Sequence, residues 1–296
     1  MMSDTLAHHH HLRTLSSTDV REPIPTPQLV TALQSPPFVY VPGTFNTRDL
    51  GSLAHLMAGA GAGCPPRLRA GYVYRSGSLE GLTLDGQATL QKLGVKKIFD
   101  LRSVAEHEHK PDPEVPGVEV VWQATTELEA VVDLEDFVEG DGERGYQKMY
   151  LDVLKVYAGV FRAVLEHILR DDDDKGESGI LVHCTAGRDR TGVLSGLLLS
   201  LAGTPPDLVE LDFMLSRIGT EPAREQLLAF ALKGSGAESV EAPGFYNLCS
   251  LKVQCWRAFV KGVEREYGGW EGYVRKQLGF SPAELETIKR NLVTPR

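Results

Sequence analysis

The sequence predicts an α/β fold with a central, mostly parallel sheet flanked by helices and followed by a C-terminal helical subdomain. Short apolar runs typical of strands lie at residues 71–75, 95–101, 118–122 and 180–182, with helical patterns between them. Strands that alternate with helices favour parallel pairing, because the intervening helix returns the chain to the same edge of the sheet. Beyond residue 192 the patterns are helical.

Length and composition predict an ordinary globular protein with one main domain and a tail. The chain has 296 residues, of which 42% are hydrophobic and 24% charged, and no apolar run of membrane-spanning length. Its 31 basic and 40 acidic residues give a net charge of −9, which argues against a nucleic-acid partner. Four cysteines without metal-ligand spacing, and no secretory signal, favour a reducing, cytoplasmic location.

The first elements follow from local patterns. Residues 1–37 hold four consecutive histidines and several prolines, and we expect a flexible N-terminal arm or a segment draped over the domain, ahead of a catalytic domain over 38–296. A strand is expected at Phe38–Val41. The stretch 82–93 predicts a helix that ends before Gly94, and the strand that follows carries Asp100 near its end.

The second half alternates in the same way. The acidic stretch 127–143 predicts a solvated loop or short helix near the cleft. Apolar residues spaced by three or four from Tyr146 to Ile168 predict one amphipathic helix that packs on the sheet. At the C-terminus, Ser281 and Glu284 form a capping-box sequence ahead of a final helix.

The chemistry is concentrated between the apolar strand 180–182 and the buried helix that opens at residue 193. A loop that leads into a helix N-terminus can direct several N–H groups at one tetrahedral oxyanion. Gly187 permits the tight turn, and Arg190 supplies a planar fork of donors for two phosphate oxygens. The predicted phosphate-binding residues are Thr185, Ala186, Gly187, Arg188, Asp189 and Arg190.

Cys184 is the candidate nucleophile, because the field that holds a phosphate also favours the thiolate form of a cysteine. Thr191 can direct its hydroxyl at the sulfur, and His183 can support the loop through its ring nitrogens. The alternative is an inert core thiol, since a lone Cys-x5-Arg spacing arises by chance. The preceding strand, the glycine in the loop and the Thr-Gly pair before the helix favour the catalytic interpretation.

The stretch His-Cys-Thr-Ala-Gly-Arg-Asp-Arg-Thr-Gly at 183–192 resembles the signature of the cysteine-dependent phosphatases. It is most similar to the atypical microbial and fungal tyrosine phosphatases, whose loop has lysine where this chain has Arg188. Further stretches that fit this family lie at residues 46–51, 74–77, 99–103 and 270–279. The resemblance implies the cysteine-dependent phosphatase fold and hydrolysis through a phosphocysteine intermediate, without a metal or organic cofactor.

The resemblance also implies roles for further residues. Arg48 and Asp49 are predicted to support the loop, although both would also suit an exposed surface. Asp189 is expected to be the general acid, with Asp100 as the alternative. Arg188 either adds a second cation to the pocket, which would suit multiply phosphorylated phosphoinositides, or turns outward and pairs with an acidic neighbour.

The sequence thus predicts a protein tyrosine phosphatase whose substrate is a phosphotyrosine-containing protein or peptide. The alternative is a phosphoinositide or dual-specificity phosphatase. A phosphotyrosine-binding pseudoenzyme is disfavoured because Cys184, Asp189 and Arg190 are all present. A sulfurtransferase is disfavoured because the Arg-Thr-Gly sequence after the loop suits phosphate chemistry.

Overall fold

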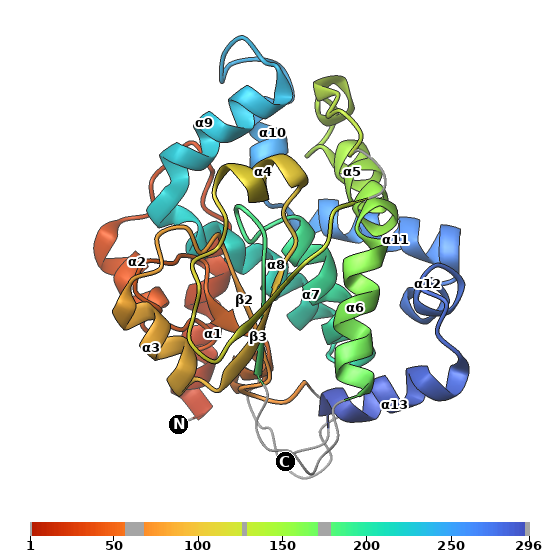
Figure 1. Ribbon diagram of the computed structural model, residues 1–296. Coiled ribbons are helices and arrows are strands. Elements are labelled where there is room, and N and C mark those ends of the chain that lie inside the picture. The colour runs from red at the N-terminus through yellow and green to blue at the C-terminus, as the bar shows by residue number, and fades with distance from the viewer. Residues whose placement is uncertain (1, 57–67, 126–128, 171–178, 294–296) are drawn as a thin grey trace.

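The computed structural model describes residues 2–56, 68–125, 129–170 and 179–293, built around a five-stranded sheet (Figure 1). The strands are β1 (Arg48–Asp49), β2 (Val73–Ser76), β3 (Val95–Asp100), β4 (Glu119–Trp122) and β5 (Gly179–His183). Their order is β1-β2-β5-β3-β4, in which only the β1–β2 pair is antiparallel. The predicted mostly parallel α/β fold is confirmed.

Helices cover both faces of this sheet. The α-helices are α1 (Met2–Ser16), α2 (Thr26–Leu33), α3 (Leu84–Lys92), α4 (Val104–His109), α5 (Glu143–Val156), α6 (Ala158–Leu169), α7 (Arg190–Leu201), α8 (Pro206–Gly219), α9 (Arg224–Ser235), α10 (Phe245–Cys249), α11 (Val253–Tyr267), α12 (Trp270–Lys276) and α13 (Pro282–Val293). Short 3-10 helices lie at η1 (Gly51–Leu56), η2 (Leu134–Phe137) and η4 (Glu221–Ala223). None of the described helices is both long and apolar enough to cross a bilayer.

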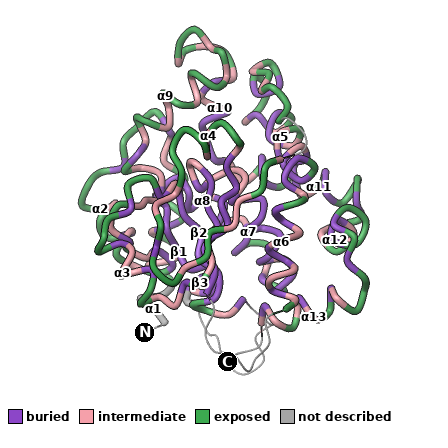
Figure 2. The backbone as a smooth tube through the Cα atoms, viewed as in Figure 1, coloured by how far each residue is buried: buried purple, intermediate pink, exposed green. Residues whose placement is uncertain are grey.

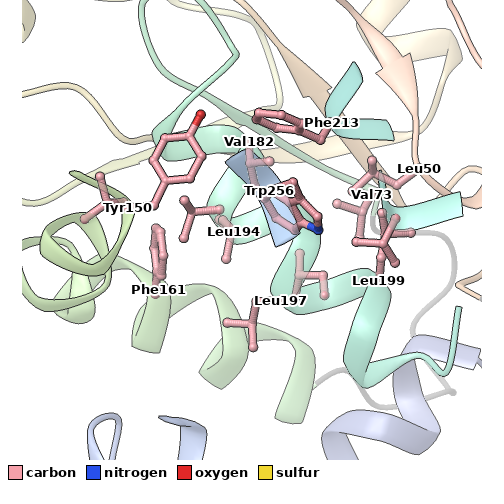
Figure 3. Packing of buried hydrophobic residues seen from close by; sticks show 14 of the residues in the cluster. Leu50, Val73, Tyr150, Phe161, Val182, Leu194, Leu197, Leu199, Phe213 and Trp256 are labelled. Atoms are coloured by element: carbon pink, nitrogen blue, oxygen red, sulfur yellow. The ribbon is translucent and has the colours of Figure 1, made fainter. Parts of the chain in front are cut away.

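The side chains of strand β5 alternate between two hydrophobic cores, one on each face of the sheet. Ile180 and Val182 point into the larger hydrophobic core, whereas Leu181 points into the smaller core beneath α3, as the two-residue period of a strand requires. In the larger core Val182 lies close to Phe213 and Leu194 (Figure 3). The C-terminal helices α11, α12 and α13 contribute to this same core, so they fix the position of α7 behind the loop at residues 184–189.

Local signals place several helix ends correctly. The side chain of Thr83 accepts a hydrogen bond from the Gly86 N–H at 3.1 Å and caps α3. This helix spans Leu84–Lys92, within two residues of the predicted 82–93. At α13 the predicted capping box is present, since Ser281 N–H donates to Glu284 and Glu284 N–H donates back to the Ser281 hydroxyl.

Three expectations differ from the structure. Residues 1–37, expected to be a flexible arm or a draped segment, contain α1 and α2, whose backbone Figure 2 colours by burial. Leu12 and Leu15 are buried, and α1 packs against α8. The strand expected at Phe38–Val41 is reduced to one bridge between Phe38 and Arg48. The single helix expected from Tyr146 to Ile168 is divided into α5 and α6, because the backbone leaves helical geometry at Tyr157 (φ −97°, ψ 12°).

Candidate active site

The candidate nucleophile lies in a loop, residues 184–189, between β5 and α7 at the carboxyl edge of the sheet. Strand β5 is completely buried, which fixes the start of the loop, and α7 begins at Arg190. Cys184 is only 2% exposed but contributes to the lining of a cavity of about 470 Å³. In open parallel sheets, ligands bind at the carboxyl ends of the strands, where this cavity lies.

Gly187 is required by the geometry of this loop. Its φ of +62° lies in the left-handed region, which residues with a side chain rarely adopt. A Cβ atom at this position would lie 2.2 Å from the carbonyl oxygen of Ser76. The close contact of the loop with the end of β2 therefore depends on glycine.

The loop carbonyls are held from outside the cavity. Asn46 Nδ2 donates to the carbonyl oxygens of Ala186 (3.1 Å) and Gly187 (2.9 Å), and Arg75 Nη2 also donates to the Gly187 oxygen (2.6 Å). In a trans peptide the N–H points opposite to the C=O. We therefore expect the N–H groups of Gly187 and Arg188 to point into the cavity, where an oxyanion would accept from them.

A buried charge cluster lies beneath these contacts. Arg48 and Arg75 are both fully buried and share the carboxylate of Asp212; the Arg48 Nε to Asp212 Oδ1 distance is 2.7 Å. Two cations and one anion leave a net positive charge under the loop. Burial and the neighbouring Arg75 lower the pKa of Arg48 to about 10, so it stays charged at neutral pH. This charge favours a bound phosphate and a thiolate.

The two predicted supports differ in what they touch. Arg48 acts on the loop through Asn46, because its Nη1 donates to the Asn46 side-chain oxygen at 2.6 Å. Asp49 contacts no residue of the loop among its described hydrogen bonds. It accepts instead from Gly51 N–H, Gly71 N–H and the Ser52 hydroxyl, and so holds the turn after β1.

Arg190 is oriented by Glu106, the N3 residue of α4. The Glu106 carboxylate accepts from Nη1 at 2.6 Å and Nη2 at 2.8 Å, and it also accepts from the Thr185 hydroxyl. Burial alone would raise the pKa of Glu106, but the hydrogen bonds from Arg190 hold it well below its usual range. Among the described residues Arg190 Nε has no partner, so the Nε and Nη2 edge is available to bind a phosphate.

His183 and Asp100 lie beneath the loop in a second polar network. His183 Nε2 is 2.7 Å from Asp112 Oδ2, and its Nδ1 is 3.3 Å from the Cys184 carbonyl oxygen. Asp100, Asp112 and His183 have ligand atoms close enough for a metal ion. The Arg102 Nη2 lies 2.8 Å from Asp100 and 2.7 Å from Asp112, so a guanidinium already supplies the positive charge there.

The two candidate acids occupy different environments. The Asp189 carboxylate lines the cavity and accepts from Tyr150 Oη at 2.8 Å and from Arg188 Nε at 3.0 Å. Asp100 has no exposed side-chain surface. Burial opposes its ionisation, yet the hydrogen bonds from Arg102 outweigh it and lower the pKa of Asp100 to about 2. A carboxyl group that stays ionised and enclosed is poorly suited to proton donation.

Arg188 combines parts of both expectations for it. It lines the cavity, but it pairs with the acidic neighbour Asp189, and its Nη atoms donate to the carbonyl oxygens of Leu248 (3.1 Å) and Cys249 (2.9 Å).

Thr191 is fully buried, and its hydroxyl has no hydrogen-bond partner among the described residues. No described hydrogen bond joins this hydroxyl to the Cys184 sulfur, so the predicted contact stays a prediction.

The walls of the cavity beyond the loop are mostly apolar. Part of the acidic stretch, residues 129–132, forms one wall, so its expected position near the cleft is confirmed. Helices α9 and α10 form the other, and Figure 1 shows both near α4 at this end of the sheet. Val131 and Phe230, exposed by 90% and 51%, present apolar side chains to an incoming ligand.

Several residues of this site were not among the predicted site residues, and among them are Asn46, Arg75, Glu106 and Asp112. Glu106 has a readable signal, because it stands three residues after Ser103 in capping-box spacing, and that capping box is present at α4. The other three lie in loops or strands far from Cys184 in the chain. Asn46 and Arg75 do lie in the stretches 46–51 and 74–77 that resemble the family, but neither stretch indicates which side chain contacts the loop, and Asp112 has no such signal.

The comparisons with known proteins agree with this geometry. A sequence model described as "Tyrosine phosphatase family" matches residues 39–294. The chain is similar to a tyrosine-protein phosphatase of Nostoc commune, with 29% identity over 74% of this chain and 73% of that protein. It is also similar to the triple specificity protein phosphatase PtpB of Mycobacterium tuberculosis, with 21% identity over 84% of this chain and 96% of that protein.

Proposed function

This chain belongs to the tyrosine phosphatase family, and from that premise we propose that it hydrolyses phosphotyrosine monoesters in proteins or peptides through a phosphocysteine intermediate. The observation that supports the proposal is that Cys184 and Arg190 line the same cavity, while Glu106 orients Arg190 by accepting hydrogen bonds from both of its Nη atoms. A nucleophile beside an oriented fork of donors suits in-line attack on a phosphate.

In the first step Cys184 Sγ attacks phosphorus, and the bond from phosphorus to the tyrosine oxygen breaks. Arg190 and the loop N–H groups bind the equatorial oxygens, whose charge increases in the transition state. Asp189 gives its proton to the departing phenol oxygen, which leaves as neutral tyrosine. Asp189 is the better placed of the two candidate acids, because it lines the cavity and Asp100 does not.

In the second step water attacks the phosphocysteine and the bond from sulfur to phosphorus breaks. The Asp189 carboxylate accepts the proton of that water, and inorganic phosphate leaves. The Thr191 hydroxyl can donate to the departing thiolate, since the described residues leave it without another partner. The catalytic thiol must remain reduced between turnovers, which supports a reducing, cytoplasmic location as part of the proposal.

The test compares the wild type with Cys184→Ser on a phosphotyrosine peptide. We expect the variant to lose at least about a hundredfold of kcat, because serine is a far weaker nucleophile, while vanadate binding is retained. PtpB is named a triple specificity protein phosphatase, which supports testing more than one substrate class. Phosphoserine, phosphothreonine and phosphoinositide substrates in the same panel test the dual-specificity and phosphoinositide alternatives. Turnover of phosphoinositides alone would favour the lipid-phosphatase alternative, and turnover by Cys184→Ser would exclude the phosphocysteine route.

A further inference from the structure

Residues 17–24, which connect α1 to α2, are hydrogen-bonded to helices that contribute residues to the lining of the cavity. Arg217, near the end of α8, donates from Nε to the Thr18 carbonyl oxygen at 3.0 Å. Its Nη2 donates to the carbonyl oxygens of Asp19 (3.2 Å) and Glu22 (2.6 Å). Its side chain is only 5% exposed, so these hydrogen bonds are shielded from water.

Glu221 and Arg224 also bind the connection between α1 and α2. Glu221 pairs with Arg217 and accepts from the Ile24 N–H at 2.9 Å, while Arg224 Nη1 donates to the Val20 carbonyl oxygen at 3.3 Å. The connection between α1 and α2 is therefore bound to α8, η4 and α9. Arg217 and Arg224 also belong to the lining of the cavity that contains Cys184.

Val20 is the residue of this connection that reaches the cavity. It is 7% exposed and packs in a small hydrophobic cluster with Phe245 and Cys249, against Leu228 of α9. Val20, Leu228 and Cys249 all line the cavity. Val20 lies outside the matched family region, which begins at residue 39.

We propose that residues 17–24 form part of the substrate-binding wall, and that Val20 is a specificity-determining residue for the group next to the phosphotyrosine. This inference rests on the proposed function and deepens it. Because Val20, Leu228 and Cys249 form an apolar patch in the lining of the cavity that contains Cys184, the group that Val20 selects is an apolar side chain adjacent to phosphotyrosine in a peptide. A small aryl phosphate has no residue next to its ring, so we expect its hydrolysis not to depend on Val20.

The experiment measures kcat/KM for wild type and Val20→Phe on p-nitrophenyl phosphate and two phosphotyrosine peptides. One peptide has leucine on both sides of the phosphotyrosine and the other has serine. Val30→Phe is the matched control, because Val30 lies on α2 in the same N-terminal region, is 45% exposed and is outside the cavity lining. Val20→Ala is the conservative variant, and thermal melting verifies that each variant is folded.

We expect the wild type to prefer the leucine peptide. In Val20→Phe this preference falls about tenfold, mainly through KM, since a few added carbons in an apolar subsite have effects of this size. Val20→Ala lowers the preference about threefold by removing apolar contact, and p-nitrophenyl phosphate changes by less than about twofold in both.

An unchanged ratio of the two peptides in Val20→Phe overturns the inference, as does an equal change in Val30→Phe. If Val20→Phe does not fold, the peptide ratio of Val20→Ala decides in the same way. Failure of the wild type to hydrolyse any of the three substrates would contradict the proposed function itself, which keeps the two failures distinct.

Discussion

Replacing Glu106 by glutamine tests whether the orientation of Arg190 depends on a charged partner. In the structure Glu106 accepts from both Nη atoms of Arg190, at 2.6 and 2.8 Å, and from the Thr185 hydroxyl. The substitution preserves the size of the side chain. It removes the negative charge and turns one acceptor oxygen into an NH2 group that must face an N–H donor.

The expected loss follows from these contacts. One charge-assisted hydrogen bond to Arg190 is lost and the other is weakened, and each is worth about 1.5–3 kcal/mol. Since about 1.4 kcal/mol corresponds to a factor of ten, kcat/KM should fall about 10- to 100-fold. The pKa of Glu106 is held well below its usual range, so the carboxylate is ionised at working pH and the loss should not depend on pH near neutrality.

The assay is kcat/KM on a phosphotyrosine peptide, with vanadate binding and thermal melting measured in parallel. Glu108→Gln is the matched control, because Glu108 is an exposed residue of the same helix α4. We expect the control to behave as the wild type, and Glu106→Gln to lose vanadate affinity together with activity. A folded Glu106→Gln whose kcat/KM stays within about twofold of wild type would refute the role assigned to this contact.

Three further predictions concern two residues of the loop, Asp189 and Gly187, and the buried Asp100 beneath it. Asp189→Asn should reduce hydrolysis of alkyl phosphates about tenfold more than that of p-nitrophenyl phosphate, which needs no acid; equal losses would indicate a structural role. Gly187→Ala should reduce kcat by at least about tenfold, because its Cβ would lie 2.2 Å from the Ser76 oxygen; normal kinetics would contradict the required turn. The folded-state pKa of Asp100, lowered from 3.8 to about 2, contributes about 2 kcal/mol of stability that is present above pH 4 and lost as the pH falls through 2. Urea unfolding between pH 5 and 2 should show this loss, and Asp100→Asn should flatten it.

The sequence alone predicted the position of the loop and the class of fold. Cys184, Gly187 and Arg190 stand within seven residues, between a buried strand and a buried helix, so the geometry that they need is local. The two-residue and 3.6-residue periods of the apolar residues likewise report which face of each strand or helix is buried. Both signals are carried by neighbouring residues and can be read without knowing the contacts of the fold.

Only the tertiary structure decided what holds the loop in place. Asn46 and Arg75 reach its carbonyls from more than a hundred residues away, and Arg217 fastens the connection that carries Val20. A polar side chain that hydrogen-bonds across the fold leaves no periodic signal in the chain, because its partner is set by how distant elements pack. The burial of the N-terminal helices likewise depends on contacts between distant parts of the chain. Their composition resembles that of an exposed arm, and it is packing against α8 that buries Leu12 and Leu15.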